Sequence, residues 1–174
     1  PKGMAQGVAL HKEYKGATAV LVEIDCRPQT VERDYGKETY TGPRVTKAVI
    51  AVDCGLVINP EGLRATIEGS SMHGVSRALH EEVAFDTEKV TNVNWRTYPT
   101  LTHADAPERI EVVLVNGDPN PKRQDLPPYG AGEASLKPML AAVGNAVFDA
   151  TGVRIRRVPF RPDRVLAALK AANV

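Results

Sequence analysis

The stretch GDPNPKRQDLPPYGAG, residues 117–132, limits the fold of this 174-residue chain more than any other feature. It contains four prolines and three glycines. Proline removes a backbone donor and glycine favours turns, so we expect a long loop here rather than a helix or a strand. Loops of this length inside compact domains are usually functional or mobile, and we expect the end of this one to line a pocket.

Strands are predicted where apolar and polar residues alternate and β-branched residues are frequent. A hairpin is predicted around Asp86-Thr87-Glu88, and the polar stretch 27–44, broken by proline and glycine, predicts a loop or an exposed hairpin excursion. The strands predicted in this way are 17–25, 45–55, 109–116 and 153–160, with the hairpin over 82–95.

Three helices are predicted from their end signals and apolar spacing. The first covers 59–85 and opens with Asn59-Pro60, a good cap and first-turn pair. The second covers 133–152 and ends on Gly152, and the third covers 161–172. Strands and helices in this mixed order predict an α+β fold in which helices pack on a mixed sheet, with residues 1–174 as a single domain.

Composition excludes several classes of function. Lys and Arg number 22 against 21 Asp and Glu, which gives no reason to expect a nucleic-acid partner. No apolar run approaches the roughly 20 residues that span a bilayer, so we expect a soluble chain, cytoplasmic or periplasmic. The chain begins at Pro1 rather than at a methionine, from which we expect a processed chain or one part of a larger protein.

The residues that commonly bind metals are too few or too far apart to form a site. Cys26 and Cys54 are not in C-x-x-C spacing, so a zinc or iron–sulfur site within this chain is not expected. His73 and His80 share a helical face, but seven residues rise by about 10.5 Å, too far for one ion. We expect His80 at the surface and His73 packed or at an interface, and we predict no metal ligands in this chain.

Glu133 follows Gly130-Ala131-Gly132 at the point where the second long helix begins, and its residue pattern supports more than one role. A carboxylate in a first helical turn is stabilised by the helix dipole by about 0.3–1 kcal/mol. Alternatively, the two glycines let a bulky ligand approach the backbone and the carboxylate faces that ligand. The helix start could also bind a small anion, although a carboxylate there would repel it.

Two sequence blocks resemble a known family. The block AVDCGLVINPEGLRATIEGSSMHGVSRALHEEV, residues 51–83, is similar to the VDCG…NP…EG…G block of molybdenum-binding subunits in the xanthine dehydrogenase/aldehyde oxidase family. The block over 130–169 resembles that family's C-terminal part, where a G-x-G-E turn precedes a helix. Within that family, the two blocks resemble the isoquinoline oxidoreductase-like β subunits.

This resemblance implies a function and a set of site residues. Glu133 would be the general base of a molybdenum hydroxylase that oxidises an aldehyde or an N-heteroaromatic ring with water as the oxygen source. The chain would be the C-terminal portion of a molybdenum-cofactor-binding domain and would share molybdenum–molybdopterin with a larger chain. A small subunit would carry the [2Fe–2S] clusters. The residues that the resemblance places at the cofactor are Gly130, Ala131, Gly132, Thr66, Glu68 and Gly69.

The sequence also departs from that family in ways that support a different function. Thr66 stands where many relatives have a cofactor-contacting glutamine, and His73 stands where some have another. Other cofactor-binding loops of the family are absent from these 174 residues. The alternative is therefore a non-catalytic structural or assembly module, or a degenerate subunit, that keeps the family's fold without its chemistry.

Overall fold

The computed structural model describes residues 3–13, 15–27, 32–35, 38–115 and 126–174. Its main sheet has four strands in the order β1-β2-β5-β6. β2 is antiparallel to both β1 and β5, and β6 runs parallel to β5. The strands of this sheet are β1 (Met4–Glu13), β2 (Gly16–Asp25), β5 (Arg44–Asp53) and β6 (Arg109–Leu114).

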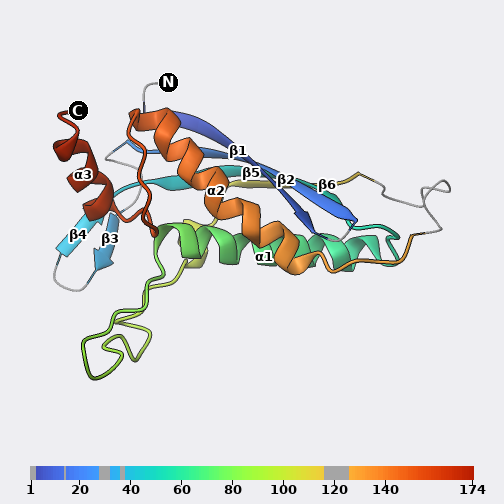
Figure 1. Ribbon diagram of the computed structural model, residues 1–174, viewed down its shortest axis with the longest axis horizontal. Coiled ribbons are helices and arrows are strands. Elements are labelled where there is room, and N and C mark those ends of the chain that lie inside the picture. Colours follow the sequence, from blue (N-terminus) through green and yellow to red (C-terminus); the bar gives the residue numbers. More distant parts are fainter. Residues whose placement is uncertain (1–2, 14, 28–31, 36–37, 116–125) are drawn as a thin grey trace.

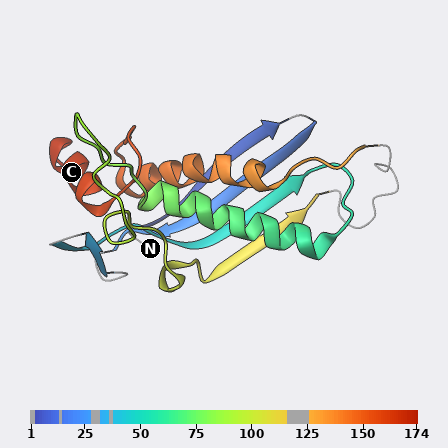
Figure 2. The same cartoon turned by 90° about the horizontal axis from the view of Figure 1, so that it is seen from below.

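The helices α1 (Pro60–Leu79) and α2 (Gly132–Thr151) lie together on one face of this sheet (Figure 1), and Figure 2 shows the strands behind them. Alternation along the strands explains the layering, because every second side chain points toward the helices. In β2 and β5 these inward residues are fully or almost fully buried. They include Val20, Val22, Ile24, Ile50 and Val52.

Small residues let the helices approach the sheet and each other closely. A Cβ added at Gly74 of α1 would lie 2.7 Å from Cβ of Met139 in α2. A Cβ added at Gly7 of β1 would collide with the backbone of Ala142 and Ala146 in the same helix. The two glycines are therefore packing positions, and they fix how α2 crosses β1 and α1.

The helix ends follow the signals in the sequence. The side chain of Asn59 accepts a hydrogen bond from Gly62 N, and α1 begins at Pro60. Helix α2 ends before Gly152, which has a left-handed φ of 72°. The helix α3 (Pro162–Ala171) begins at the predicted proline. The predicted α+β fold, a mixed sheet with helices packed on it, is confirmed.

Three parts of the sequence prediction differ from the structure. β1 lies outside the predicted strands. The strand predicted at 153–160 is wrong, because this segment follows α2 without a neighbouring strand, and Arg154 lies over the Phe148 ring instead. The hairpin predicted at 82–95 is reduced to its turn, with one isolated bridge between Phe85 and Val90.

The predicted excursion at 27–44 contains a separate antiparallel pair, β3 (Glu32–Tyr35) and β4 (Glu38–Thr41). This agrees with the hairpin alternative. Its residues 28–31 and 36–37 lie outside the described residues, as do residues 116–125 of the predicted long loop. The described end of that loop, 126–131, contains no helix and no strand beyond one isolated bridge.

Candidate functional site

The two sequence blocks that resemble the molybdenum-binding subunits meet in space. Gly55, at the end of the VDCG motif, pairs with Pro128 in an isolated bridge, and Tyr129 N donates a hydrogen bond to Cys54 O over 2.8 Å. Gly55 has a φ of 76°, and a Cβ there would collide with Pro127 O. A glycine is therefore required at the point where the strand end meets the loop before α2.

A second contact joins the middle of α1 to the glycine turn. The hydroxyl of Ser70 donates a hydrogen bond to Gly132 O, and the hydroxyl of Ser135 donates to the same oxygen over 2.9 Å. Thr66 lies one helical turn before Ser70, and its Cγ2 would be 3.7 Å from a Cβ added at Gly132. The Thr66 hydroxyl itself donates to Gly62 O of its own helix, so the residue presents its methyl group to the turn.

Helix α2 begins at this turn without a side-chain cap, because Ala131 occupies the cap position. The first N–H groups of a helix have no partner within the helix, so they remain available to a ligand. Ala131 has its side chain in the core, which leaves only its backbone for such a contact. The Glu133 side chain follows and is 87% exposed. The predicted helix start within a few residues of Glu133 is confirmed.

A chain of charged side chains connects Glu133 to the end of β1. Lys137 Nζ lies 3.9 Å from a Glu133 carboxylate oxygen and 2.7 Å from Glu13 Oε2. Glu13 in turn lies 3.5 Å from His11 Nε2. The hydrogen bond from Lys137 lowers the pKa of Glu13 below its ordinary value. Lys137 is therefore held between one carboxylate of the sheet and the carboxylate at the helix start.

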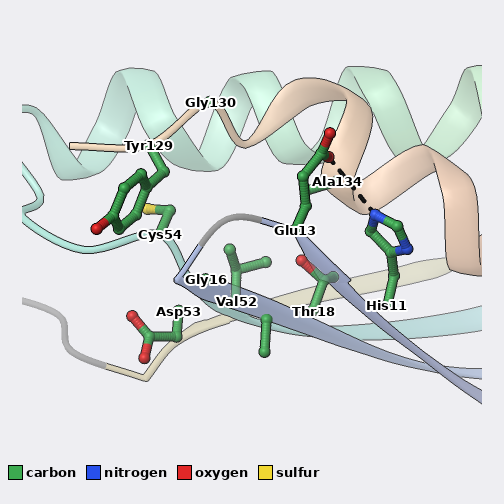
Figure 3. Close-up of a pocket in the computed structure, with 11 residues that line it drawn as sticks. His11, Glu13, Gly16, Thr18, Val52, Asp53, Cys54, Tyr129, Gly130 and Ala134 are labelled. Carbon is green, nitrogen blue, oxygen red and sulfur yellow. Dashed lines mark ion pairs between the residues drawn. The ribbon is translucent and has the colours of Figure 1, made fainter.

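These elements enclose a small cavity of about 10 Å³, enough for roughly one water molecule (Figure 3). Its lining includes residues from the loop end, the strand end and β1: Tyr129 and Gly130, Asp53 and Cys54, and His11. This confirms that the loop end lines a pocket, although a small one. Burial raises the pKa of the Cys54 thiol, so this cysteine stays protonated at neutral pH.

The structure brings some of the predicted cofactor residues together and separates others. Gly132 lies next to Thr66, and Gly130 is two residues before Gly132 in the same turn. Gly69 follows Thr66 by three residues, so the two lie on neighbouring positions of the α1 surface. A Cβ added at Gly69 or Gly130 would meet nothing within 4 Å, so both backbones face open space. Glu68 is two residues from Thr66, about 200° around the helix, and so points to the other side of α1. Its contact with the cofactor stays a prediction.

Sequence reasoning missed the residues that hold the turn in place. None of these residues belongs to a recognisable sequence motif: they are Ser70, Ser135, Tyr129, Lys137 and Glu13. Ser70 and Ser135 could have been noticed as small polar residues at helical positions next to glycines. The pairing of Glu13 with Lys137 joins residues 124 positions apart, and no local pattern predicts it.

Two further histidines belong to α1, His73 within the helix and His80 at its C-terminal cap. His80 is 4% exposed, so the expectation that it lies at the surface is wrong. The side chain of His73 is exposed and lines an open groove of about 450 Å³ together with Trp95 and Tyr98. Among the described residues, no group of three or more His, Cys, Asp or Glu side chains could hold a metal ion. None of the described helices is long and apolar enough to cross a membrane.

Comparison with known proteins gives one family. The family model of the molybdopterin cofactor-binding domain matches residues 5–107. One subunit of the nicotinate dehydrogenase from Pseudomonas putida is 42% identical over 97% of this chain and 13% of its own length. The beta chain of isoquinoline 1-oxidoreductase from Brevundimonas diminuta is 31% identical over 98% of this chain and 19% of its own length.

A solved structure of similar fold agrees with this family. The crystal structure of quinoline 2-oxidoreductase from Pseudomonas putida 86 has a TM-score of 0.66 and 28% sequence identity, and the match covers 89% of this chain and 18% of that one. The chain thus spans less than a fifth of the length of these relatives. The resemblance inferred from the two sequence blocks is confirmed.

Proposed function

We propose that this chain, which belongs to the molybdopterin cofactor-binding domain family, forms one wall of the cofactor pocket in a molybdenum hydroxylase. The enzyme would oxidise an aldehyde or an N-heteroaromatic substrate, with water as the oxygen source. The observation that carries this proposal is the convergence of the two family-like blocks at one open turn, where Gly132 is hydrogen-bonded to Ser70 and Gly55 is paired with Pro128.

The residues at this turn fit a bulky cofactor. The backbone at Gly130 and Gly69 has nothing within 4 Å of a Cβ position, so a ligand can approach it closely. The first N–H groups of α2 lack a side-chain cap and can donate to acceptor atoms of the pterin. Gly130, Ala131 and Gly132 would hold the cofactor through their backbone, and Thr66 and Gly69 would border it. The molybdenum cofactor supplies the redox chemistry when bound.

Glu133 is the residue of this chain that would act on a proton. Its carboxylate extends from the rigid first turn of α2, and its one ion pair among the described residues is the 3.9 Å contact with Lys137. It is therefore free to accept a proton from the water that attacks the substrate. General-base help of this kind accelerates reactions by about 10²–10⁴-fold.

The remainder of the pocket would come from a larger molybdenum-binding chain or segment. The relatives are at least five times longer than the part that matches this chain, which leaves room for the other cofactor loops. Electrons would leave through a small [2Fe–2S] subunit. The substrate would be a small molecule bound between Glu133 and that larger part.

The test replaces Glu133 in the molybdenum-loaded enzyme. Glu133→Gln keeps the size of the side chain but cannot take up the proton, so turnover should fall at least about 10²-fold. Molybdenum content and melting temperature should stay near those of the parent. Glu61→Gln is the matched control, because Glu61 is an acidic residue in the first turn of α1. Turnover within about threefold of the parent at full molybdenum loading would rule out Glu133 as the base.

The second candidate is a structural or assembly module without chemistry, favoured by Thr66. Its hydroxyl bonds to its own helix, so it does not offer the polar contact of a glutamine. Molybdenum analysis of the native complex separates the two functions. A complex without molybdenum, with the glycine turn intact, would favour the structural module.

A further inference from the structure

The face of the sheet opposite α1 and α2 carries two apolar rows that cross the strands. One row is Leu10, Ala19, Ala51 and Val113, which are paired neighbours from β1 to β6. The other begins with Val8, Leu21 and Val49 and ends at Glu111. Leu10 is 72% exposed and Val8 is 58% exposed. The strands are therefore apolar on both faces, although within the described residues helices cover only one of them (Figures 1 and 2).

Polar residues border these rows along the strands. The next row on one side is Gln6, Glu23, Lys47 and Arg109, and the row on the other side contains Lys12, Ala17 and Asp53. The charges at the first border are paired within the sheet. Gln6 Nε2 donates to Glu23, Lys47 Nζ lies 3.8 Å from Glu111, and Arg109 also pairs with Glu111. An apolar centre with a satisfied polar rim is the usual composition of a protein interface.

The size of the apolar area indicates what kind of partner can cover it. Four strands about 4.8 Å apart and two side-chain rows about 7 Å apart give an area of about 300 Å². A stable interface between separate proteins buries about 800 Å² on each partner. The rows alone are therefore too small to hold a second copy of the chain. They are large enough for a segment tethered to the same polypeptide, because tethering raises its effective concentration.

We infer that these two rows are the docking surface for an apolar segment of the larger molybdenum-binding polypeptide, on the side of the sheet away from the glycine turn. The length of the relatives, of which this chain matches 13–19%, supports that occupant over a separate protein. Internal pairing of the charges along the border that contains Glu23, Lys47 and Arg109 argues for an apolar rather than a charged partner. The inference rests on the proposed function in one respect only, that the chain is part of a larger molybdenum-binding polypeptide.

The test measures thiol accessibility in the full-length molybdenum-binding protein. Leu10→Cys places a thiol in one of the two apolar rows, at its β1 end. Lys12→Cys places one on the same strand and face, but in the bordering row. We expect maleimide to label position 10 at least tenfold more slowly than position 12 in the folded protein, and equally fast after denaturation. Labelling is read by peptide mass spectrometry, so the native Cys26 and Cys54 do not interfere.

Two outcomes would overturn the inference. Equal labelling rates at positions 10 and 12 in the folded protein would mean that the rows face solvent. Protection at position 10 that disappears on dilution would assign the surface to a second copy or a separate protein. Neither outcome depends on turnover, so a failure here is distinguishable from a failure of the Glu133 assignment.

Discussion

The Ser70 hydroxyl donates a hydrogen bond to the carbonyl oxygen of Gly132, which joins the middle of α1 to the first residue of α2. Ser135 donates to the same oxygen from within α2. The position of the glycine turn, and with it the direction of Glu133, therefore depends on two serines rather than on the loop alone.

Ser70→Ala should lower the free energy of unfolding by about 1 kcal/mol, the usual net value of one such hydrogen bond. Chemical denaturation of the purified protein measures this. The double variant with Ser135→Ala should lose more than the sum of the two single variants, because Gly132 O then loses both donors. A strictly additive or neutral double variant would show that the serines do not share this role.

Lys137→Met should raise the pKa of Glu13 toward its ordinary value of 4.5, because the hydrogen bond from Lys137 is the main cause that lowers it. Methionine keeps most of the side-chain length without the charge. Carbon-13 NMR titration of the Glu13 carboxyl group measures the change directly. Lys170→Met, in the last turn of α3, is a control in which the Glu13 titration should not move. An unchanged pKa in Lys137→Met would contradict the pairing.

Glu82→Gln should weaken the attachment of α3. Burial raises the pKa of Glu82, but hydrogen bonds from Arg164 and Arg157 outweigh it, so the folded protein has a lowered pKa. The resulting stabilisation is present above the unfolded value of 4.5 and is lost as the pH falls below it. We expect a loss of about 1 kcal/mol at pH 7.

The difference in unfolding free energy between the parent and Glu82→Gln should therefore shrink as the pH falls from 7 to 3. Urea denaturation at several pH values measures it. A difference that grows toward low pH would contradict the sign of the shift. The Arg164→Gln variant should reproduce the same dependence, because it removes the other partner of the pair.

A pair of glycine substitutions separates packing from cofactor contact. Gly7→Ala places a Cβ against the backbone of Ala142 and Ala146, so it should cost about 1–3 kcal/mol. Gly69→Ala meets nothing within 4 Å and should stabilise α1 by about 0.5–1 kcal/mol. Melting temperatures of the two variants test this. If Gly69 borders the cofactor as proposed, Gly69→Ala should nevertheless reduce molybdenum loading of the full enzyme, and normal loading would remove Gly69 from the site.

Much of the fold was predictable because its signals are local. Alternation predicted β2, β5 and β6, and Asn59-Pro60 and Gly152 predicted helix ends, since caps and turn residues act on their immediate neighbours. β1 was not predicted. Its Gly7 is an unusual strand residue, and only the close approach of α2 explains why a glycine belongs there.

The segment 153–160 shows the opposite case, because its alternating VRIRRVPF pattern predicts a strand. A strand needs a neighbour to pair with, and this segment lies beside α2 instead, where Arg154 Nη1 donates to Asn145 Oδ1 over 2.8 Å. A local sequence pattern indicates which face of a segment is apolar. It does not indicate whether the edge of a sheet lies close enough for that segment to pair with it.

For the site, the sequence by itself determined that Glu133 follows a glycine turn at a helix start, because the glycines, the prolines and the carboxylate are adjacent in the chain. Only the tertiary structure decided that Thr66 and Ser70 face that turn while Glu68 points away from it, and that Lys137 lies between Glu13 and Glu133. The contacts of Thr66 and Ser70 with Gly132, and of Lys137 with Glu13, join residues 62 to 124 positions apart, and they depend on how α1, α2 and the sheet pack. Packing of that kind is set by the whole core rather than by any local stretch of sequence.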